Sequence, residues 1–245
     1  MAISRPLVIA HRGASGAAPE NTLAALQHAV DIGAGAVEFD VRRTADGQIV
    51  LMHDGSVDRT TDGAGKVEDL TLDQIRALDA GTWKGKRFAG ERVPALRDAL
   101  ELLKGRAMPV IEIKDEGIAS EVVGQIMKMD MAANVTVICF NAETLRQVRE
   151  FNARIRTSLL IGEKEAPPPN GLIRLVRDAK ANHPDLQWGL ATRDCVEAFH
   201  AGGMPVWVWT VNEREAMRRI VVLGVDGITT DQPATLLDVI NAGGI

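Results

Sequence analysis

Short apolar runs alternate along this chain with longer stretches whose apolar residues recur at helical spacing. The short runs predict strands at 7–10, 36–40, 109–113, 135–139, 157–161, 187–190, 205–210 and 227–229. The longer stretches predict one helix that starts at Asn21-Thr22 and others at 96–103, 119–129, 142–151, 172–179, 193–201, 213–222 and 233–240. Strands that alternate with helices form a parallel sheet. Eight such strands predict the α/β class and a closed TIM (β/α)8 barrel.

One segment interrupts this alternation. Asp46-Gly47 lies between two extended runs, which is typical of a hairpin, and a hairpin cannot join parallel neighbours. We therefore expect 41–52 to leave the barrel rim and to return to it at His53. The polar stretch that follows is too long for an ordinary loop. The sequence predicts a single barrel domain over 1–245, with a small inserted subdomain at about 55–95 on the active-site face.

Ionisable residues stand where the apolar strands end. His11 and Arg12 end the first strand, and Glu38 and Asp40 lie at i and i+2 of the second, so that they share one face. Several strands that end this way favour one shared site at the carboxyl ends of the barrel strands. The candidate residues at this rim are His11, Arg12, Glu38, Asp40, His53, Glu112, Lys114, Trp209 and Asn212.

Three of these candidates are carboxylates that would repel one another in a low-dielectric cavity. Oxygen ligands from Glu38, Asp40 and Glu112 favour one hard divalent cation, Mg²⁺ or Ca²⁺. Protonation of a carboxylate is the alternative, because paired carboxylates raise one another's pKa. Arg12 and Lys114 suit an anionic phosphoryl group, although each could instead form an ion pair with the same carboxylates.

Two histidines at one rim indicate acid–base catalysis. The ordinary pKa of histidine lies near neutrality, so His11 and His53 could exchange protons with a substrate. Trp209 and Phe140 are candidates for the wall of the substrate site. Asp231 could orient a site group or cap the last helix, and we favour the cap. The remaining histidines, His28, His183 and His200, are expected to be surface or packing residues.

Composition narrows the classes of partner. A net charge of −5 without basic clusters argues against nucleic acid, and no apolar run is long enough for stable membrane insertion. The two cysteines, Cys139 and Cys195, are expected to be reduced and buried or nearly so. No secretory signal peptide is visible, so we expect a cytoplasmic protein. The oligomeric state stays open.

Several short motifs, in this order and spacing, resemble the glycerophosphodiester phosphodiesterases. The resemblance implies a TIM barrel that hydrolyses a small-molecule glycerophosphodiester to sn-glycerol 3-phosphate and an alcohol. It implies that His11 and His53 are the acid–base pair, that Glu38, Asp40 and Glu112 bind metal, and that Arg12 and Lys114 contact phosphate, as in the bacterial cytoplasmic enzymes. The matching segments are His11-Arg12-Gly13, Pro19-Glu20-Asn21-Thr22, Glu38-Phe39-Asp40-Val41, His53-Asp54, Arg59-Thr60-Thr61-Asp62-Gly63, Leu78-Asp79-Ala80-Gly81, Glu112-Ile113-Lys114, Trp209-Thr210-Val211-Asn212 and Gly224-Val225-Asp226-Gly227.

Two other functions are alternatives, and the first of them would use the same residues. A phospholipase D-like or cyclising phosphodiesterase that acts on lysophospholipids would need an exposed apolar rim, for which the 55–95 segment offers mainly Trp83 and Phe88. A non-catalytic phosphate-binding barrel would be expected to lack a histidine or a carboxylate of the constellation. The sequence leaves open whether water or a glycerol hydroxyl attacks phosphorus, and which histidine is the first base.

Overall fold

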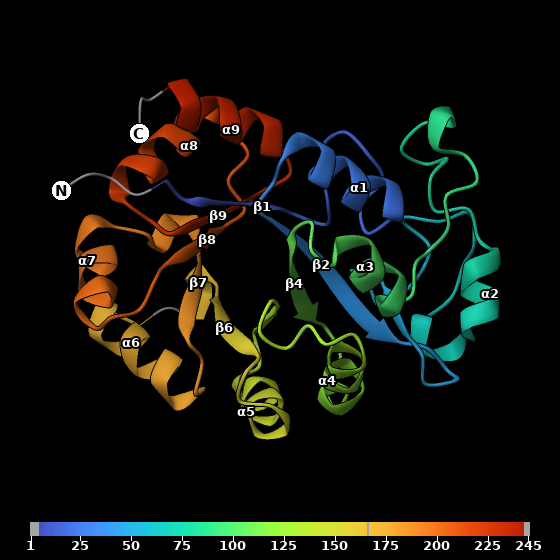
Figure 1. Ribbon diagram of the computed structural model, residues 1–245, viewed down its shortest axis with the longest axis horizontal. Helices are drawn as coiled ribbons and strands as arrows, with labels where there is room; N and C mark the ends of the chain where they lie inside the picture. The colour runs from blue at the N-terminus through green and yellow to red at the C-terminus, as the bar shows by residue number, and fades with distance from the viewer. Residues whose placement is uncertain (1–4, 166, 243–245) are drawn as a thin grey trace.

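A computed structural model describes residues 5–165 and 167–242. Eight parallel strands close into a barrel, because β1 pairs both with β2 and with β9 (Figure 1). The predicted TIM barrel is thereby confirmed. The barrel strands are β1 (Leu7–Ala10), β2 (Ala36–Arg43), β4 (Met108–Ile113), β5 (Thr136–Cys139), β6 (Arg156–Ile161), β7 (His183–Gln187), β8 (Trp207–Trp209) and β9 (Gly227–Thr230).

Helices surround the barrel and bury their apolar faces against it (Figure 1). Hydroxyl and amide side chains begin several of them: Thr22, Asn141 and Thr192 accept hydrogen bonds from free backbone amides of the first turn. The helices around the barrel are α1 (Leu23–Ile32), α3 (Leu96–Leu103), α4 (Ala119–Lys128), α5 (Ala142–Phe151), α6 (Pro169–Asp178), α7 (Arg193–Ala201), α8 (Arg214–Leu223) and α9 (Pro233–Ala242).

Strand alternation divides the side chains between two apolar layers. On β2, Val37, Phe39 and Val41 point outward into the core between sheet and helices. The barrel interior is filled below the site by Ile9, Ala36, Val110, Ile138, Leu160 and Trp207. Gly227 makes room for the Trp207 indole, because a Cβ at this position would lie 2.6 Å from the ring. The interior is therefore a packed base on which the polar residues of β1, β2 and β4 stand.

The predicted hairpin is confirmed, since β2 pairs antiparallel with β3 (Ile49–Leu51) outside the barrel. The segment after β3 contains α2 (Leu72–Ala77) and has an apolar core of its own, to which Val57 and Ile75 belong. In Figure 1 it lies to one side of the barrel. Lys84 and Arg87 attach it to the loop after β1 by donating to backbone carbonyls at 2.6 and 2.9 Å. The domain boundaries, 1–245 with an insertion at about 55–95, stay a prediction.

The strand predicted at 187–190 is wrong. The strand is His183–Gln187, and Trp188–Leu190 forms a 3₁₀ helix. His183 and Asp185 are buried on the inner face of this strand. Because the prediction relied on runs of apolar residues, a strand with polar residues on its buried face was missed. His183 thus packs inside the barrel, with its ring 4.4 Å from that of Trp207. The other 3₁₀ helices are Val67–Asp69, Lys86–Phe88 and Glu163–Glu165.

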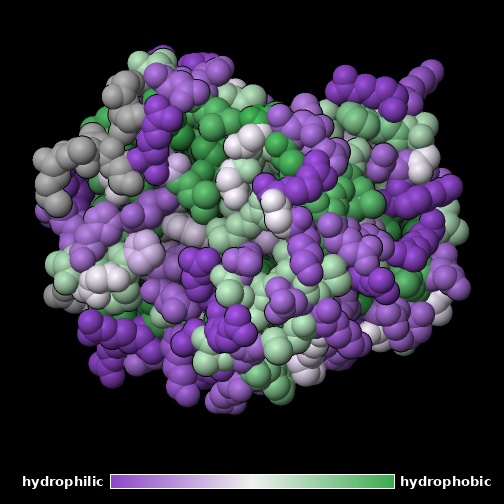
Figure 2. Space-filling model, viewed as in Figure 1, coloured by the Kyte–Doolittle hydropathy of each residue, from purple (hydrophilic) through white to green (hydrophobic). Residues whose placement is uncertain are grey.

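The surface hydropathy and the state of the two cysteines agree with what the composition predicts. Hydrophilic residues cover much of the face in Figure 2, and the most hydrophobic residues show mainly in the recesses between them. Within the described ranges, no helix is both long enough and apolar enough to cross a bilayer. Cys139 and Cys195 are free and buried, as predicted.

Candidate active site

A cavity of about 210 Å³ lies at the carboxyl ends of the barrel strands. Two predicted site residues do not line it. Asp40 is fully buried and forms ion pairs with Arg12 and Lys114, and Asn212 donates to Asp231 beside the cavity. The structure therefore brings the predicted constellation together. The predicted residues that line the cavity are His11, Arg12, Glu38, His53, Glu112, Lys114, Phe140 and Trp209.

The three predicted metal ligands form one cluster. Glu38, Asp40 and Glu112 are all buried, and each offers a carboxylate oxygen within 4.8 Å of the others. Burial, and then the charge of Asp40, raises the pKa of Glu38 to about 8 and also raises that of Glu112. Burial acts in the same direction on Asp40, but the charges of Lys114 and Arg12 outweigh it and lower its pKa to about 2. Lys114 and Arg12 thus compensate the negative charge of Asp40 better than they compensate the charges of Glu38 and Glu112.

The donor set fits a hard divalent cation. Glu38 Oε1 is buried without a hydrogen-bond partner among the described residues, although its Oε2 accepts from the backbone amide of Arg12 at 2.8 Å. Asn21 fixes Asp40 by donating to its Oδ2 at 2.8 Å. A buried carboxylate oxygen without a partner is costly, and oxygen ligands of this kind suit Mg²⁺ or Ca²⁺. The cluster is therefore compatible with one divalent cation.

The backbone after β1 is shaped around Glu38. Arg12 has a left-handed φ of 55°, and Gly13 follows with a φ of 79°. A Cβ on Gly13 would lie 2.5 Å from the backbone carbon of Ala25, so only glycine fits against α1 here. This turn aims the Arg12 amide at the Glu38 carboxylate.

Arg12 and Lys114 lie beside the carboxylates and line the same cavity. Arg12 Nε is 3.2 Å from Asp40 Oδ2, and Lys114 Nζ is 3.0 Å from Asp40 Oδ1 and 2.5 Å from Glu112 Oε1. The ion pairs considered from the sequence as an alternative to phosphate contacts are thus present. Both side chains keep part of their surface open, 17% for Arg12 and 14% for Lys114. An anion in the cavity can therefore reach them.

His11 is held by a residue for which we had favoured another role. Its Nδ1 lies 2.6 Å from Asp231 Oδ1, and Asn212 donates to the other Asp231 oxygen at 2.6 Å. Burial lowers the pKa of His11, but the hydrogen bond to Asp231 and the charge of Glu38 outweigh it, so the pKa is raised. The prediction of a structural cap for Asp231 is corrected, because the closure of β9 on β1 brings its carboxylate to the histidine.

His53 is held in the same way at the start of the insertion. Its Nδ1 lies 2.6 Å from Asp54 Oδ1, and Arg59 donates to Asp54 Oδ2 at 2.6 Å. Arg59 also donates to Glu20 at 2.8 and 2.9 Å, and Glu20 accepts from Arg12 at 2.8 Å. Burial lowers the pKa of His53 despite the opposing effects of Asp40 and Asp54. A continuous set of ion pairs therefore joins the second histidine to the phosphate-contact candidate Arg12.

The opposite wall of the cavity is apolar. The Phe140 and Trp209 rings meet edge to face, with centroids 5.6 Å apart, and Trp209 Nε1 donates to the Asp185 carbonyl at 3.0 Å. Ile138 and Leu160 complete this wall. Among the residues that line the cavity, Asp185 is the one carboxylic acid on this apolar wall.

Comparison with known proteins decides the family. The model of the glycerophosphoryl diester phosphodiesterase family matches residues 11–235. The chain belongs to this family. A glycerophosphodiester phosphodiesterase of Caldanaerobacter subterraneus subsp. tengcongensis is 38% identical, over 98% of this chain and all of that protein. One of Bacillus altitudinis is 32% identical, over 92% and 94%.

Solved structures of this family have the same fold. A glycerophosphodiester phosphodiesterase of Agrobacterium tumefaciens superposes with a TM-score of 0.85 at 30% identity, covering 95% of this chain and 99% of that one. An Oleispira antarctica phosphodiesterase, solved in complex with the product sn-glycerol-3-phosphate, gives a TM-score of 0.86 at 28% identity, covering 96% and 97%. This chain is accordingly an enzyme of the phosphodiesterase family, with a small-molecule substrate.

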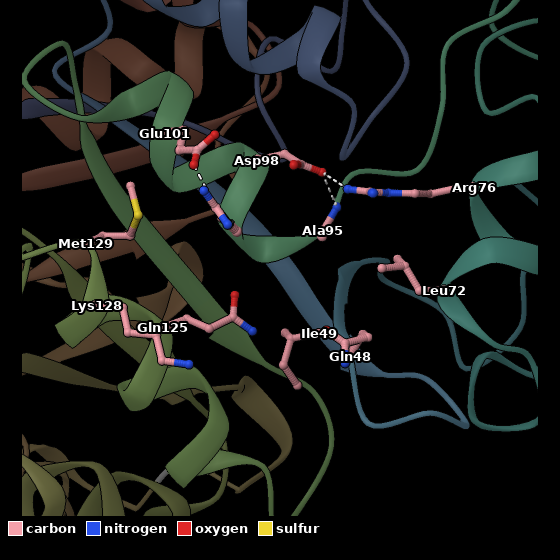
Figure 3. A pocket seen from close by; sticks show the side chains of 11 residues that line it. Gln48, Ile49, Leu72, Arg76, Ala95, Asp98, Glu101, Gln125, Lys128 and Met129 are labelled. Atoms are coloured by element: carbon pink, nitrogen blue, oxygen red, sulfur yellow. Dashed lines mark hydrogen bonds and ion pairs between the residues drawn. The ribbon is translucent and has the colours of Figure 1, made fainter.

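A larger hollow of about 640 Å³ lies outside the phosphodiesterase barrel (Figure 3). It is bordered by α2, α3, α4 and the β2–β3 hairpin. Most of its charged side chains already have partners: Asp98 pairs with Arg76 and accepts from the Ala95 amide at 2.9 Å, and Arg97 pairs with Glu101 at 2.7 Å. These contacts cap α3 and attach α2 to it. The hollow does not contain the residues of the carboxylate cluster, and we assign it no part in the chemistry.

Sequence reasoning missed some residues of the site and underused others. Glu20, Asp54 and Arg59 occur in the motifs of the family resemblance, which gave them no role. Asp185 carried no signal, because its strand was placed too late in the chain. Asp54 directly follows His53, and Asp231 directly follows the last barrel strand, and these positions are the signal that could have found them.

Proposed function

We propose that this protein hydrolyses glycerophosphodiesters to sn-glycerol 3-phosphate and an alcohol, using one bound divalent cation. The observation that carries the proposal is the cluster of three buried carboxylates, with oxygens within 4.8 Å, facing two cations and two histidines in one cavity. The family match and the relative solved with sn-glycerol-3-phosphate support the same reaction.

Glu38, Asp40 and Glu112 are the proposed ligands of this cation, Mg²⁺ or Ca²⁺. Such an ion acts as a Lewis acid toward phosphoryl oxygens. Arg12 and Lys114 line the same cavity and are proposed to bind the phosphate oxygens, where a guanidinium provides a planar pair of donors and an ammonium a compact charge. Their role is to neutralise the charge that develops in the transition state.

The two histidines are the proposed proton carriers. Each has its Nδ1 beside a carboxylate, Asp231 for His11 and Asp54 for His53, which leaves Nε2 for proton transfer. One histidine takes the proton from the attacking oxygen, and the other gives a proton to the leaving alcohol. The attacking oxygen is that of water or that of a glycerol hydroxyl, in which case a cyclic phosphate forms first.

Phe140 and Trp209 are the proposed wall for the uncharged part of the substrate. Phe140 is 52% exposed at the mouth, which also makes it the feature that favours the alternative substrate class, lysophospholipids. The volume of the cavity, about 210 Å³, and the charged residues in its lining argue for a small diester rather than a lipid. The cytoplasmic location stays a prediction.

The test is an assay of glycerol 3-phosphate release. The protein is incubated with glycerophosphocholine, glycerophosphoethanolamine or a lysophospholipid, with Mg²⁺ or Ca²⁺ and with or without a chelator. We expect release from the two glycerophosphodiesters that stops with the chelator, and phosphorus NMR during turnover detects a cyclic phosphate if one forms. No release from either diester with either ion would overturn the proposal. Cleavage of the lysophospholipid releases its head-group alcohol and leaves the acylated glycerol phosphate, so this arm is followed by choline release. Turnover of the lysophospholipid alone would support the alternative.

A further inference from the structure

Asp185 is a buried acid that the proposed chemistry does not use. It lies on the inner face of β7, 1% exposed, in register with Leu160 of β6 and Trp207 of β8. Its side chain lines the cavity, and its Oδ1 has no hydrogen-bond partner among the described residues. A buried polar atom without a partner destabilises a fold by the lost solvation. Such a group at the base of an active-site cavity is more readily explained by a ligand than by packing.

The surroundings of Asp185 differ from those of the metal-ligand candidates. Arg12 and Lys114 form ion pairs with Asp40, whereas the wall around Asp185 consists largely of apolar side chains, Leu160 and Trp209 among them. Burial, and then the nearby charge of Glu38, raises the pKa of Asp185 well above its ordinary range. A carboxyl group in its neutral form both donates and accepts a hydrogen bond, as an alcohol hydroxyl does. It is a poor partner for a quaternary ammonium group, which has no proton to donate.

We propose that Asp185 binds a hydroxyl group of the substrate's glycerol moiety and so selects glycerol over simple alkyl groups on phosphate. This inference rests on the proposed function of the cavity and adds to it a residue that determines specificity. The phosphate lies on the side of Arg12, Lys114 and the carboxylates, and the glycerol carbon chain lies against Leu160 and Trp209. A site built to bind a hydroxyl discriminates strongly against an analogue that lacks it, because its own polar group is then left without a partner.

The test compares three phosphate monoesters that differ only in their hydroxyl groups. Dissociation constants of sn-glycerol 3-phosphate, 3-hydroxypropyl phosphate and n-propyl phosphate are measured by calorimetry with Mg²⁺ present, so the result does not depend on which oxygen attacks phosphorus. We expect the wild type to prefer sn-glycerol 3-phosphate over n-propyl phosphate by roughly tenfold or more. In Asp185→Leu the two constants should converge, through weaker binding of sn-glycerol 3-phosphate alone, while Asp185→Asn should keep most of the preference. 3-Hydroxypropyl phosphate has only the terminal hydroxyl, so its dissociation constant shows which hydroxyl group accounts for the preference.

A control and a second measurement separate recognition from structure. Leu160→Val, at the position paired with Asp185, should weaken both ligands alike. Thermal unfolding of the ligand-free protein should move to higher temperature in Asp185→Leu, since an unpaired buried acid is removed. A lower melting temperature with equal loss of both ligands would assign Asp185 a structural role and overturn the inference. Equal binding of both ligands by the wild type would overturn it too, while failure of every ligand to bind the wild type would overturn the proposed function of the cavity itself.

Discussion

The two halves of the active-site cavity are built on opposite principles. On β1, β2 and β4, charged side chains are buried in ion pairs, and Asp40 alone meets both Arg12 and Lys114. On β5, β6 and β8, the wall is apolar and its aromatic rings contact each other. Charge stabilisation demands groups that are fixed before the substrate arrives, whereas recognition of a small alcohol demands shape and a few polar contacts. The comparison therefore suggests that chemistry and recognition are separated across the barrel axis.

The largest effect is expected from the charged half. Glu112→Gln keeps the size of the side chain but removes one anionic ligand, so we expect kcat/KM to fall more than about 100-fold, beyond the usual cost of losing an outer-shell partner. Mg²⁺ binding should weaken in parallel, as calorimetry would measure. Glu101→Gln, the same change on the outer face of α3, is the matched control and should leave both unchanged. Activity near the wild-type level in Glu112→Gln would remove this residue from the ion site.

The second-largest effect distinguishes proton transfer by the histidines from metal binding by the carboxylates. His53→Ala removes a proposed proton carrier without removing a ligand, so we expect kcat to fall by roughly 100-fold or more while Mg²⁺ affinity is kept. His11→Ala should behave alike. The control is His28→Ala on the exposed face of α1. If kcat stayed within a few-fold of wild type in either rim variant, that histidine would have no part in proton transfer.

The charged half was the more predictable of the two. A polar residue at the end of an apolar strand stands out in a sequence, and the i and i+2 spacing on β2 already places Glu38 and Asp40 on one face. The barrel itself was predictable for a similar reason, since α3, α5 and α7 have the predicted bounds. The local pattern of apolar and polar residues was thus enough to predict both the barrel and the charged half of its site.

The parts that were predicted wrongly or missed depend on contacts between residues far apart in the sequence or on polar residues inside the barrel. Asp231 reaches His11 only because β9 closes the barrel against β1, across 220 positions of sequence. β7 was misplaced because polar His183 and Asp185 occupy its inner face, where the base of a ligand cavity replaces the usual apolar filling. The departures from the expected strand pattern thus coincide with the part of the barrel assigned here to recognition.

A smaller effect is expected from the apolar half. Trp209→Ala removes the edge-to-face contact with Phe140 and much of the wall, so we expect KM to rise roughly tenfold with a lesser change in kcat. Trp209→Phe keeps an aromatic wall and should recover most of the affinity. Steady-state kinetics with glycerophosphocholine measures both parameters. A loss confined to kcat would contradict the separation of recognition from chemistry.

The smallest effect concerns the hydrogen bond that holds His11. The folded-state pKa of His11 is raised above its ordinary value of 6.5, chiefly because the bond to Asp231 and the charge of Glu38 outweigh burial. A raised pKa means that protonated His11 favours the folded state. This contribution is complete below about pH 6.5 and is lost as the pH rises through the folded-state value. Asp231→Asn should lower the His11 pKa in a metal-free NMR titration and cost about 1 kcal/mol of stability below pH 6.5.

The pH dependence distinguishes this contact from a general loss of packing. If the bond to protonated His11 is the cause, the difference in free energy of unfolding between wild type and Asp231→Asn shrinks as the pH rises above 6.5, because the wild type then loses the same charge. Asp54→Asn, which removes the corresponding partner of His53, should leave the His11 titration unchanged. A difference that is constant with pH, or an unchanged His11 titration in Asp231→Asn, would contradict the assignment. The charged half would then owe its order to the carboxylate cluster alone.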